Sequence, residues 1–321
     1  MSLTVAIQMD PIQGININTD SSFMLAVEAQ TRGHSLYYYS PSELAFRDGT
    51  LFAKIHPIEV RREMGNHVSV GEQELTDLSS VDVVLMRQDP PFDMAYITAT
   101  HLLEHVHPDT LVVNDPMEVR NAPEKLFVTH FENLLPPTLI TSDQAEIYAF
   151  RDEHKDVIIK PLFGNGGADV FHITQDDENM SALIEMFADK YREPIIVQRY
   201  LPEIRQGDKR IILVDGFPVG GVLRIPVDGD ARANFHAGGS ALKTSLTSRE
   251  KQICEIIGPA LKSRGLLFVG IDVIGNYLTE INVTSPTGIQ EINELDGIKI
   301  EKLVWDAIED RLANQNHLKT L

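Results

Sequence analysis

The strongest constraint on the fold is a segment near the C-terminal end that predicts a hairpin carrying two carboxylates on one face. Residues 268–288 read FVGIDVIGNYLTEINVTSPTG, and Gly275-Asn276 marks a turn between two strand-like runs. Side chains alternate along a strand, so Glu280 and Asn282 share one face. A three-residue loop or a bulge at the turn would then set Asp272 opposite Glu280.

Two carboxylates that face each other destabilise a sheet unless positive charge lies between them. Asp272, Glu280 and the Asn282 amide form a hard oxygen set that suits Mg²⁺, and Mn²⁺ is expected to substitute for it. We therefore predict these three residues as metal ligands; the alternative is an outward polar face of the sheet. On the same reasoning, neutralising Glu280 would relieve repulsion and leave stability unchanged or higher.

A glycine-rich segment, GNGGADV at 164–170, lies between two short strand-like runs. It lacks both the GK[ST] of a P-loop and the helix-opening glycine of a dinucleotide fingerprint. Its bare backbone N–H groups indicate a flap that closes over phosphates, with an ordinary hairpin turn as the alternative. Lys160, which ends the apolar run VIIK, and Lys125 are predicted either to meet anionic oxygens or to extend into solvent.

A second polar cluster surrounds the phrase QGDKR, where Asp208 and Arg210 share one face at the start of a strand. Arg210 could hold phosphate oxygens as a fork, or the two residues could form a surface ion pair. Downstream, the polar stretch from Val227 to Lys243 is too long for a tight turn, and we predict a lid there that carries Arg232 and His236.

Hydrophobic periodicity divides the chain into three parts and predicts an α/β (α+β) protein. Residues 1–120 open with a strand, a helix over 20–33 and another strand, the pattern of a βαβ unit. Residues 121–200 predict a small lobe with one helix, over 179–191. Residues 201–321 predict hairpins followed by two helices, over 248–264 and 299–314.

Composition excludes several functional classes. The chain has 47 acidic and 28 basic residues, for a formal net charge of −19, which repels nucleic acid and anionic membranes. The single cysteine, Cys254, excludes an internal disulfide. No run approaches the ~20 apolar residues of a membrane span, and no basic segment precedes the first apolar run, so we expect a cytoplasmic protein. The sequence has no GxSxG motif, so nothing in it indicates the nucleophile of a serine hydrolase.

The motifs in their order resemble the ATP-grasp fold and, within it, the prokaryotic-type glutathione synthetase family. The resemblance runs through nearly the whole chain and is carried by MDPIQGININTDSSF, LMRQDPPFD, NAPEKLF, IIKPLFGNGGADVF, QRYLPEIRQGDKR and LLFVGIDVIGNYLTEINVTSPTG. It implies an ATP-grasp fold preceded by an N-terminal βαβ domain. One departure is HAGGSALK at 236–243, which lacks an arginine that enterobacterial members of the family carry.

The resemblance also implies a role for each site residue. ATP would be bound by Lys125, Lys160, Gly164, Gly166, Gly167, Gln198, Tyr200, Leu201 and Asp208. Arg210 and Arg224 would act in catalysis. The dipeptide γ-glutamylcysteine would lie near Arg87, Arg224, Asn282, Thr284 and Ser285.

The implied reaction joins γ-glutamylcysteine to glycine through an acyl phosphate and releases ADP and phosphate from ATP. The resemblance further implies a homo-oligomer, a homotetramer by family analogy. Two alternatives remain at this point: another ATP-grasp ligase of the D-alanine–D-alanine or glutamate-adding type, or a noncatalytic ATP-binding sensor.

Overall fold

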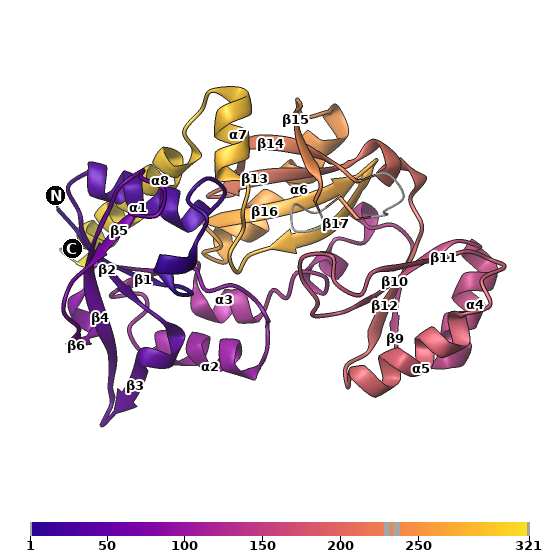
Figure 1. Cartoon of the computed structure of the whole chain (residues 1–321), viewed down its shortest axis with the longest axis horizontal. Helices are drawn as coiled ribbons and strands as arrows, with labels where there is room; N and C mark the ends of the chain where they lie inside the picture. The colour runs from indigo at the N-terminus through magenta and orange to yellow at the C-terminus, as the bar shows by residue number, and fades with distance from the viewer. Residues whose placement is uncertain (1, 228–231, 234–237, 320–321) are drawn as a thin grey trace.

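The computed structural model describes residues 2–227, 232–233 and 238–319, and its strands form three sheets (Figure 1). The first sheet has a parallel core of β1 (Thr4–Gln8), β2 (Ser35–Tyr39), β7 (Val83–Met86) and β8 (Leu111–Val113). Helices α1 (Ser21–Thr31), α2 (Met94–Leu103) and α3 (Pro116–Arg120) belong to the same part of the chain. The predicted βαβ opening is therefore confirmed. The expected helix over 20–33 begins one residue later, because Asp20 is its N-cap and its carboxylate accepts from the Phe23 N–H at 2.6 Å.

An antiparallel extension of this sheet was not predicted. Its central strand is β4 (Thr50–Val60), which pairs with β2. Three further strands pair with β4: β3 (Leu44–Arg47), β5 (Val68–Val70) and β6 (Glu74–Asp77). Short 3-10 helices lie at Ile12–Gly14, Pro41–Glu43, Leu78–Ser80, Phe127–His130, Glu132–Leu134 and Pro202–Gln206.

The second sheet has the order β11-β10-β12-β9, with every pair antiparallel. Its strands are β9 (Thr138–Thr141), β10 (Val157–Pro161), β11 (Phe171–Ile173) and β12 (Ile195–Arg199). Two helices, α4 (Gln144–His154) and α5 (Met180–Lys190), accompany it, so the prediction of one helix was wrong. The sequence of α4 is mostly polar and only Ile147 is fully buried, which leaves no apolar periodicity to detect.

The third sheet has the order β15-β14-β13-β16-β17. Its strands are β13 (Asp208–Val214), β14 (Phe217–Ile225), β15 (Ser240–Lys243), β16 (Phe268–Ile274) and β17 (Tyr277–Asn282). Helices α6 (Ser248–Ser263), α7 (Ile289–Asp296) and α8 (Ile300–Lys319) follow, one more than predicted. Helix α7 is short and lies between Gly288 and Gly297, both with positive φ. Because it has few turns, its apolar residues do not repeat often enough to reveal a helical period in the sequence.

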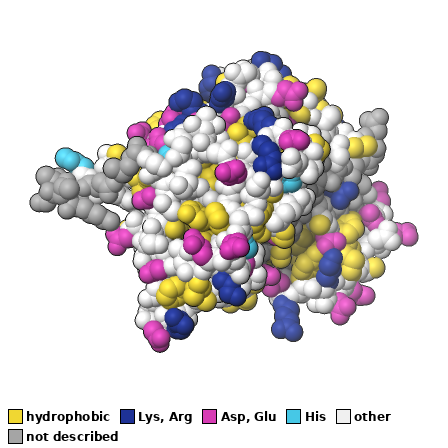
Figure 2. Space-filling view, turned by 60° about the vertical axis from the view of Figure 1, so that its left-hand side comes forward, with side chains coloured by type: hydrophobic (Ala, Val, Ile, Leu, Met, Phe, Trp, Pro, Cys, Tyr) yellow, Lys and Arg dark blue, Asp and Glu magenta, His cyan; other side chains and the backbone are white. Residues whose placement is uncertain are grey.

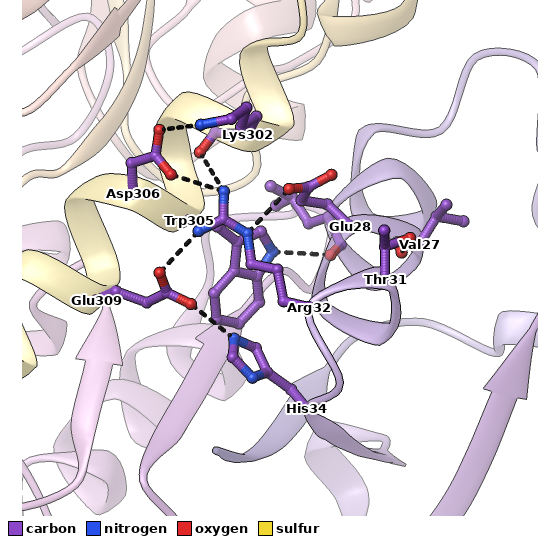
Figure 3. Close-up of polar contacts among 10 residues, drawn as sticks. Val27, Glu28, Thr31, Arg32, His34, Lys302, Trp305, Asp306 and Glu309 are labelled. Atoms are coloured by element: carbon purple, nitrogen blue, oxygen red, sulfur yellow. Dashed lines mark hydrogen bonds and ion pairs between the residues drawn. The ribbon is translucent and has the colours of Figure 1, made fainter. Parts of the chain in front are cut away.

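The C-terminal helix, α8, packs against α1, the first helix of the chain. Arg32 at the end of α1 bridges Glu28 of its own helix to Asp306 and Glu309 of α8 (Figure 3). The buried Trp305 indole N–H donates to the Leu25 carbonyl at 2.8 Å. These contacts bring the two ends of the chain together at one end of the molecule (Figure 1).

The third sheet lies between the first sheet and the small second sheet along the long axis (Figure 1). On the face seen in Figure 2, Lys and Arg side chains are interspersed with Asp and Glu and do not gather into one basic area. Across the part of the chain that the structure describes, every helix is too short or too polar to cross a membrane.

Candidate active site

A single cavity of about 760 Å³ collects every residue predicted to bind ATP, metal or dipeptide. It is lined by side chains of the second and third sheets, by the glycine-rich segment, by the start of α1 and by the residues that follow β7. The predicted residues in its wall are Arg87, Lys125, Lys160, Gly164, Gly166, Gly167, Gln198, Tyr200, Leu201, Asp208, Arg210, Arg224, Asp272, Glu280, Asn282, Thr284 and Ser285. Residues that are far apart in the sequence therefore face one space.

The wall formed by the third sheet follows from strand register. Asp272 on β16 pairs with Glu280 on β17, and a bulge follows between Asp272 and Val273. This confirms the predicted hairpin. Arg210 on β13 pairs with Asp272, so residues directly opposite each other put charged side chains from three neighbouring strands on one face.

Asp272 is held by two arginines from neighbouring strands. Arg210 donates to both carboxylate oxygens, at 2.6 and 2.9 Å, and Arg224 Nη2 lies 3.0 Å from Oδ1. Burial alone would raise the pKa of Asp272, but the two guanidinium charges outweigh it and hold that pKa below its usual range. The positive charge that the opposed carboxylates require is thus supplied in part by the protein itself.

Asp208 and Arg210 are both about 6% exposed, so the alternative of a surface ion pair between them was wrong. Asp208 instead accepts two hydrogen bonds from Arg224, at 2.7 and 2.5 Å. Arg224, which is fully buried, therefore links Asp208 to Asp272. This network fixes the orientation of both arginines, which is what a preorganised anion site needs.

Lys125 and Lys160 are buried in the wall rather than extended into solvent, so the solvent-exposed alternative was wrong for both. Each Nζ lies 3.6 Å from Glu280 Oε1, and Lys125 also pairs with Glu124 and donates to the Gly164 carbonyl. Burial lowers the pKa of Lys160, and the nearby charge of Lys125 adds to this. Burial would also lower the pKa of Lys125, but Glu280 and Glu124 outweigh it and raise that pKa.

The glycine-rich segment connects β10 to β11 and lines the cavity, and its Gly164 carbonyl accepts from Lys125. Gly166 and Gly167 have positive φ, of 62° and 78°, a conformation that favours glycine. Arg232 Nη1 donates to the Gly167 carbonyl at 3.2 Å, which joins the predicted lid to the predicted flap. His236, the other lid residue predicted to meet anions, lies outside the described residues.

One wall of the cavity is built by the second sheet and the residues that follow it. Ile158 on β10 pairs with Gln198 on β12, and both line the cavity together with Tyr200 and Leu201. The Gln198 amide donates to the Thr138 hydroxyl at 3.0 Å, which fixes its orientation. Apolar and amide groups side by side suit a flat heterocycle that needs a few directed hydrogen bonds.

The opposite end of the cavity contains Arg87, which is fully buried. Its Nε donates to the Ser22 hydroxyl and its Nη2 to the Pro286 carbonyl, each at 3.0 Å. Among the described residues Nη1 has no hydrogen-bond partner, and the same is true of the Asn282 amide nitrogen. Two unsatisfied donors in one cavity wall are suited to a polar, anionic ligand.

Sequence reasoning missed several residues of this wall. Ser22 orients Arg87, and Asp89 accepts from the Ser285 hydroxyl at 2.7 Å. Gly270 lies opposite Asn282, and a Cβ there would come within 3.2 Å of Arg210 Cδ, so a larger residue would require the Arg210 side chain to shift by a few tenths of an ångström. No sequence signal marks Gly270 for this role, because the close approach involves β13, far away along the chain.

The predicted metal ligands fit Mg²⁺ in chemistry. Asp272 and Glu280 lie directly opposite each other, and the Asn282 side chain lines the same wall, where its carbonyl oxygen is the atom that could bind the metal. Asp272 Oδ1 lies close to both arginines, whereas Oδ2 accepts from Arg210 Nη2 and has a second lone pair for another partner. Within the described residues, no three His, Cys, Asp or Glu side chains converge as a metal site on their own. Further oxygens would thus have to come from Asn282, water or a ligand.

Comparisons with known proteins agree with the geometry. The chain matches the family model for the prokaryotic glutathione synthetase N-terminal domain over residues 3–120 and that for the ATP-grasp domain over residues 124–297. It is 59% identical to a glutathione synthetase of Agrobacterium fabrum over 97% of this chain and 98% of that protein. It is 44% identical to the glutathione synthetase of Escherichia coli over 98% of this chain and 100% of that protein.

Solved structures share the fold at low sequence identity. A D-cycloserine synthetase superposes with a TM-score of 0.67 at 14% identity, covering 96% of this chain and 99% of that one. A D-alanyl-alanine synthetase from Vibrio cholerae superposes with a TM-score of 0.61 at 11% identity, covering 98% and 99%. At these identities the likeness concerns the fold alone.

Proposed function

This chain belongs to the prokaryotic glutathione synthetase family, and we propose that the central cavity performs its reaction with the residues assembled there. The protein is an ATP-dependent ligase with an ATP-grasp fold behind an N-terminal domain, and it forms glutathione from γ-glutamylcysteine and glycine. The observation that carries the assignment of residues is the buried cluster of Lys125, Lys160, Arg210 and Arg224 around the Asp272–Glu280 pair.

ATP is bound between the second and third sheets in this proposal. The adenine lies against Ile158 and Gln198, with Tyr200 and Leu201 at its edge. The phosphates lie between Lys125 and Lys160 on one side and the backbone N–H groups of Gly164, Gly166 and Gly167 on the other. Asp208 acts by orienting Arg224.

The dipeptide occupies the end of the cavity near the first sheet. Arg87 has a free donor there for a carboxylate, and Thr284 and Ser285 offer hydroxyls in the same wall. The cysteinyl carboxylate then points toward Arg210 and Arg224, beside the phosphates.

Charge placement accounts for the chemistry. A carboxylate oxygen of the dipeptide attacks the γ-phosphorus, the bond from that phosphorus to the β,γ-bridging oxygen breaks, and ADP leaves. The glycine amine attacks the resulting acyl carbon, phosphate leaves with the former carboxylate oxygen, and the amine loses a proton. Lys160, Arg210 and Arg224 stabilise the negative charge of both steps, because they are fixed before the substrates arrive. No protein nucleophile is required.

Asp272, Glu280 and Asn282 would hold Mg²⁺, or Mn²⁺ in its place, and the ion would neutralise phosphate charge when bound. We further propose domain boundaries near residues 120 and 200. In support, the three sheets span residues 4–113, 138–199 and 208–282. A homotetramer and a cytoplasmic location complete the proposal, on family analogy and on the single cysteine, buried Cys254.

The test supplies purified protein with ATP, Mg²⁺, γ-glutamylcysteine and glycine, and omits each component in turn. Glutathione, ADP and phosphate should form in equal amounts only when all four are present. D-alanine and glutamate serve as comparison acceptors and should give no product. Release of AMP and pyrophosphate would refute the mechanism, and ATP binding without turnover would favour a noncatalytic sensor.

A further inference from the structure

The Tyr200 ring, which lines the cavity, stacks on a histidine outside the cavity wall. The imidazole of His172 lies 3.9 Å from the Tyr200 ring, centroid to centroid, with an interplanar angle of 18°. His172 Nε2 is buried, has no hydrogen-bond partner among the described residues, and lies 3.6 Å from Asp156 Oδ2. The position of the imidazole is therefore set by its stack on Tyr200 and by a loose contact with Asp156.

The rest of Tyr200 is held from two further directions. Its backbone N–H donates to the Asp156 carbonyl at 2.9 Å, and its hydroxyl accepts from Arg205 Nε at 3.0 Å. Asp156 thus contacts both members of the stack, one through its carbonyl and the other through its carboxylate. Together these contacts restrain the Tyr200 ring beside the proposed adenine site.

Strand register explains how His172 reaches this place. His172 on β11 pairs with Ile158 on β10, which pairs in turn with Gln198 on β12. Residues directly opposite each other share a face, so His172 extends the row whose other two members line the cavity. It is also the second residue of β11, the strand that follows the glycine-rich segment.

We propose that His172 is a positioning residue for the nucleotide: its ring braces the Tyr200 ring and so sets the affinity for ATP without contacting it. The inference rests on the proposed ATP site. It differs from a purely structural role, because the ring should affect the nucleotide and leave the dipeptide and glycine untouched. The proposed role also differs from an electrostatic one, because an uncharged aromatic ring at position 172 should support ATP binding equally well.

Two variants separate these roles. His172→Gln removes the ring and keeps a polar side chain, whereas His172→Phe keeps the ring and removes both nitrogens. His154→Gln is the matched control, since His154 packs on Phe150 of α4 with centroids 4.3 Å apart and lies outside the cavity wall. For each protein we would measure kcat, the KM for each substrate, the Kd for ATP by calorimetry and the Tm.

An aromatic pair contributes enough that His172→Gln should raise the KM and Kd for ATP by roughly two- to tenfold. Its kcat and the other two KM values should stay within about twofold of the wild type, and His172→Phe should match the wild type throughout. Unchanged ATP affinity in His172→Gln, an equal loss in His172→Phe, or a joint rise of all three KM values with a lower Tm would each overturn the inference. If the wild type binds ATP but forms no glutathione, the proposed function fails while calorimetry still decides the role of His172.

Discussion

The structure and the sequence alone predict opposite effects of neutralising Glu280 on the stability of the fold. Sequence alone emphasises repulsion between Glu280 and Asp272 and predicts that Glu280→Gln leaves stability unchanged or raises it. The structure predicts that Glu280→Gln lowers stability, because Glu280 Oε1 also lies 3.6 Å from Nζ of both Lys125 and Lys160. Two arginines, Arg210 and Arg224, already compensate the negative charge of Asp272.

The size of the effect can be worked from these distances. At 3.6 Å and an effective dielectric constant of about 20, each lysine attracts the carboxylate by roughly 4 to 5 kcal/mol before desolvation is counted. Removing one member of a buried pair costs about 3 to 5 kcal/mol. Lys125 keeps Glu124 and the Glu280 side chain is 18% exposed, so we expect a smaller loss, of about 2 kcal/mol. For a protein of this size that lowers the Tm by roughly 3 °C.

Activity should fall much further than stability. Glu280→Gln removes a predicted metal ligand and disturbs both phosphate-facing lysines, so turnover should drop at least about 100-fold. The assay pairs thermal unfolding without ligands with ADP release under saturating substrates. Glu294→Gln, on the exposed side of α7, makes the same charge change and should alter neither. A Glu280→Gln protein with a Tm above the wild type, or with normal turnover, would refute this reasoning.

Three further predictions concern Lys160 in the cavity wall and Arg32 and His34 near helix α8. Lys160→Met should raise the KM for ATP and lower kcat about 100-fold in an ADP-release assay, whereas the exposed Lys251→Met should not; equal kinetics would remove Lys160 from the site. Arg32→Met should lower the free energy of unfolding in urea by about 1 to 2 kcal/mol at low salt, because three carboxylates each lose an arginine contact (Figure 3), and an unchanged midpoint would contradict this. His34 should make stability fall as pH drops from about 7.5 to 5.5. Burial lowers the pKa of His34, so unfolding takes up a proton in this range, and His34→Gln should flatten the profile by comparison.

Local pattern was enough to predict the hairpin. Alternation with period two, together with a Gly-Asn turn, predicted the shared face of Glu280 and Asn282. It predicted Asp272 opposite Glu280 only if the turn contained a three-residue loop or a bulge, and the structure has the bulge. The same holds for the parallel opening of the chain. In both cases the information lies within a few residues along the sequence.

Contacts between distant strands could not be predicted in this way. Asp272 is neutralised by Arg210 and Arg224 only because β14, β13, β16 and β17 are adjacent in that order, which no local period encodes. The docking of α8 on α1 through Trp305 likewise joins the two ends of the chain. The roles of individual residues toward ATP and the dipeptide, and the domain boundaries, stay predictions.

In the proposed mechanism the dipeptide carboxylate is phosphorylated in the cavity before glycine attacks. Turnover with γ-glutamylcysteine carrying ¹⁸O in both cysteinyl carboxylate oxygens tests it directly, with mass spectrometry of every product. Transfer through an acyl phosphate predicts one ¹⁸O atom in each released phosphate, one in each glutathione amide carbonyl and none in ADP. Phosphate free of label, or label in AMP, would contradict the account.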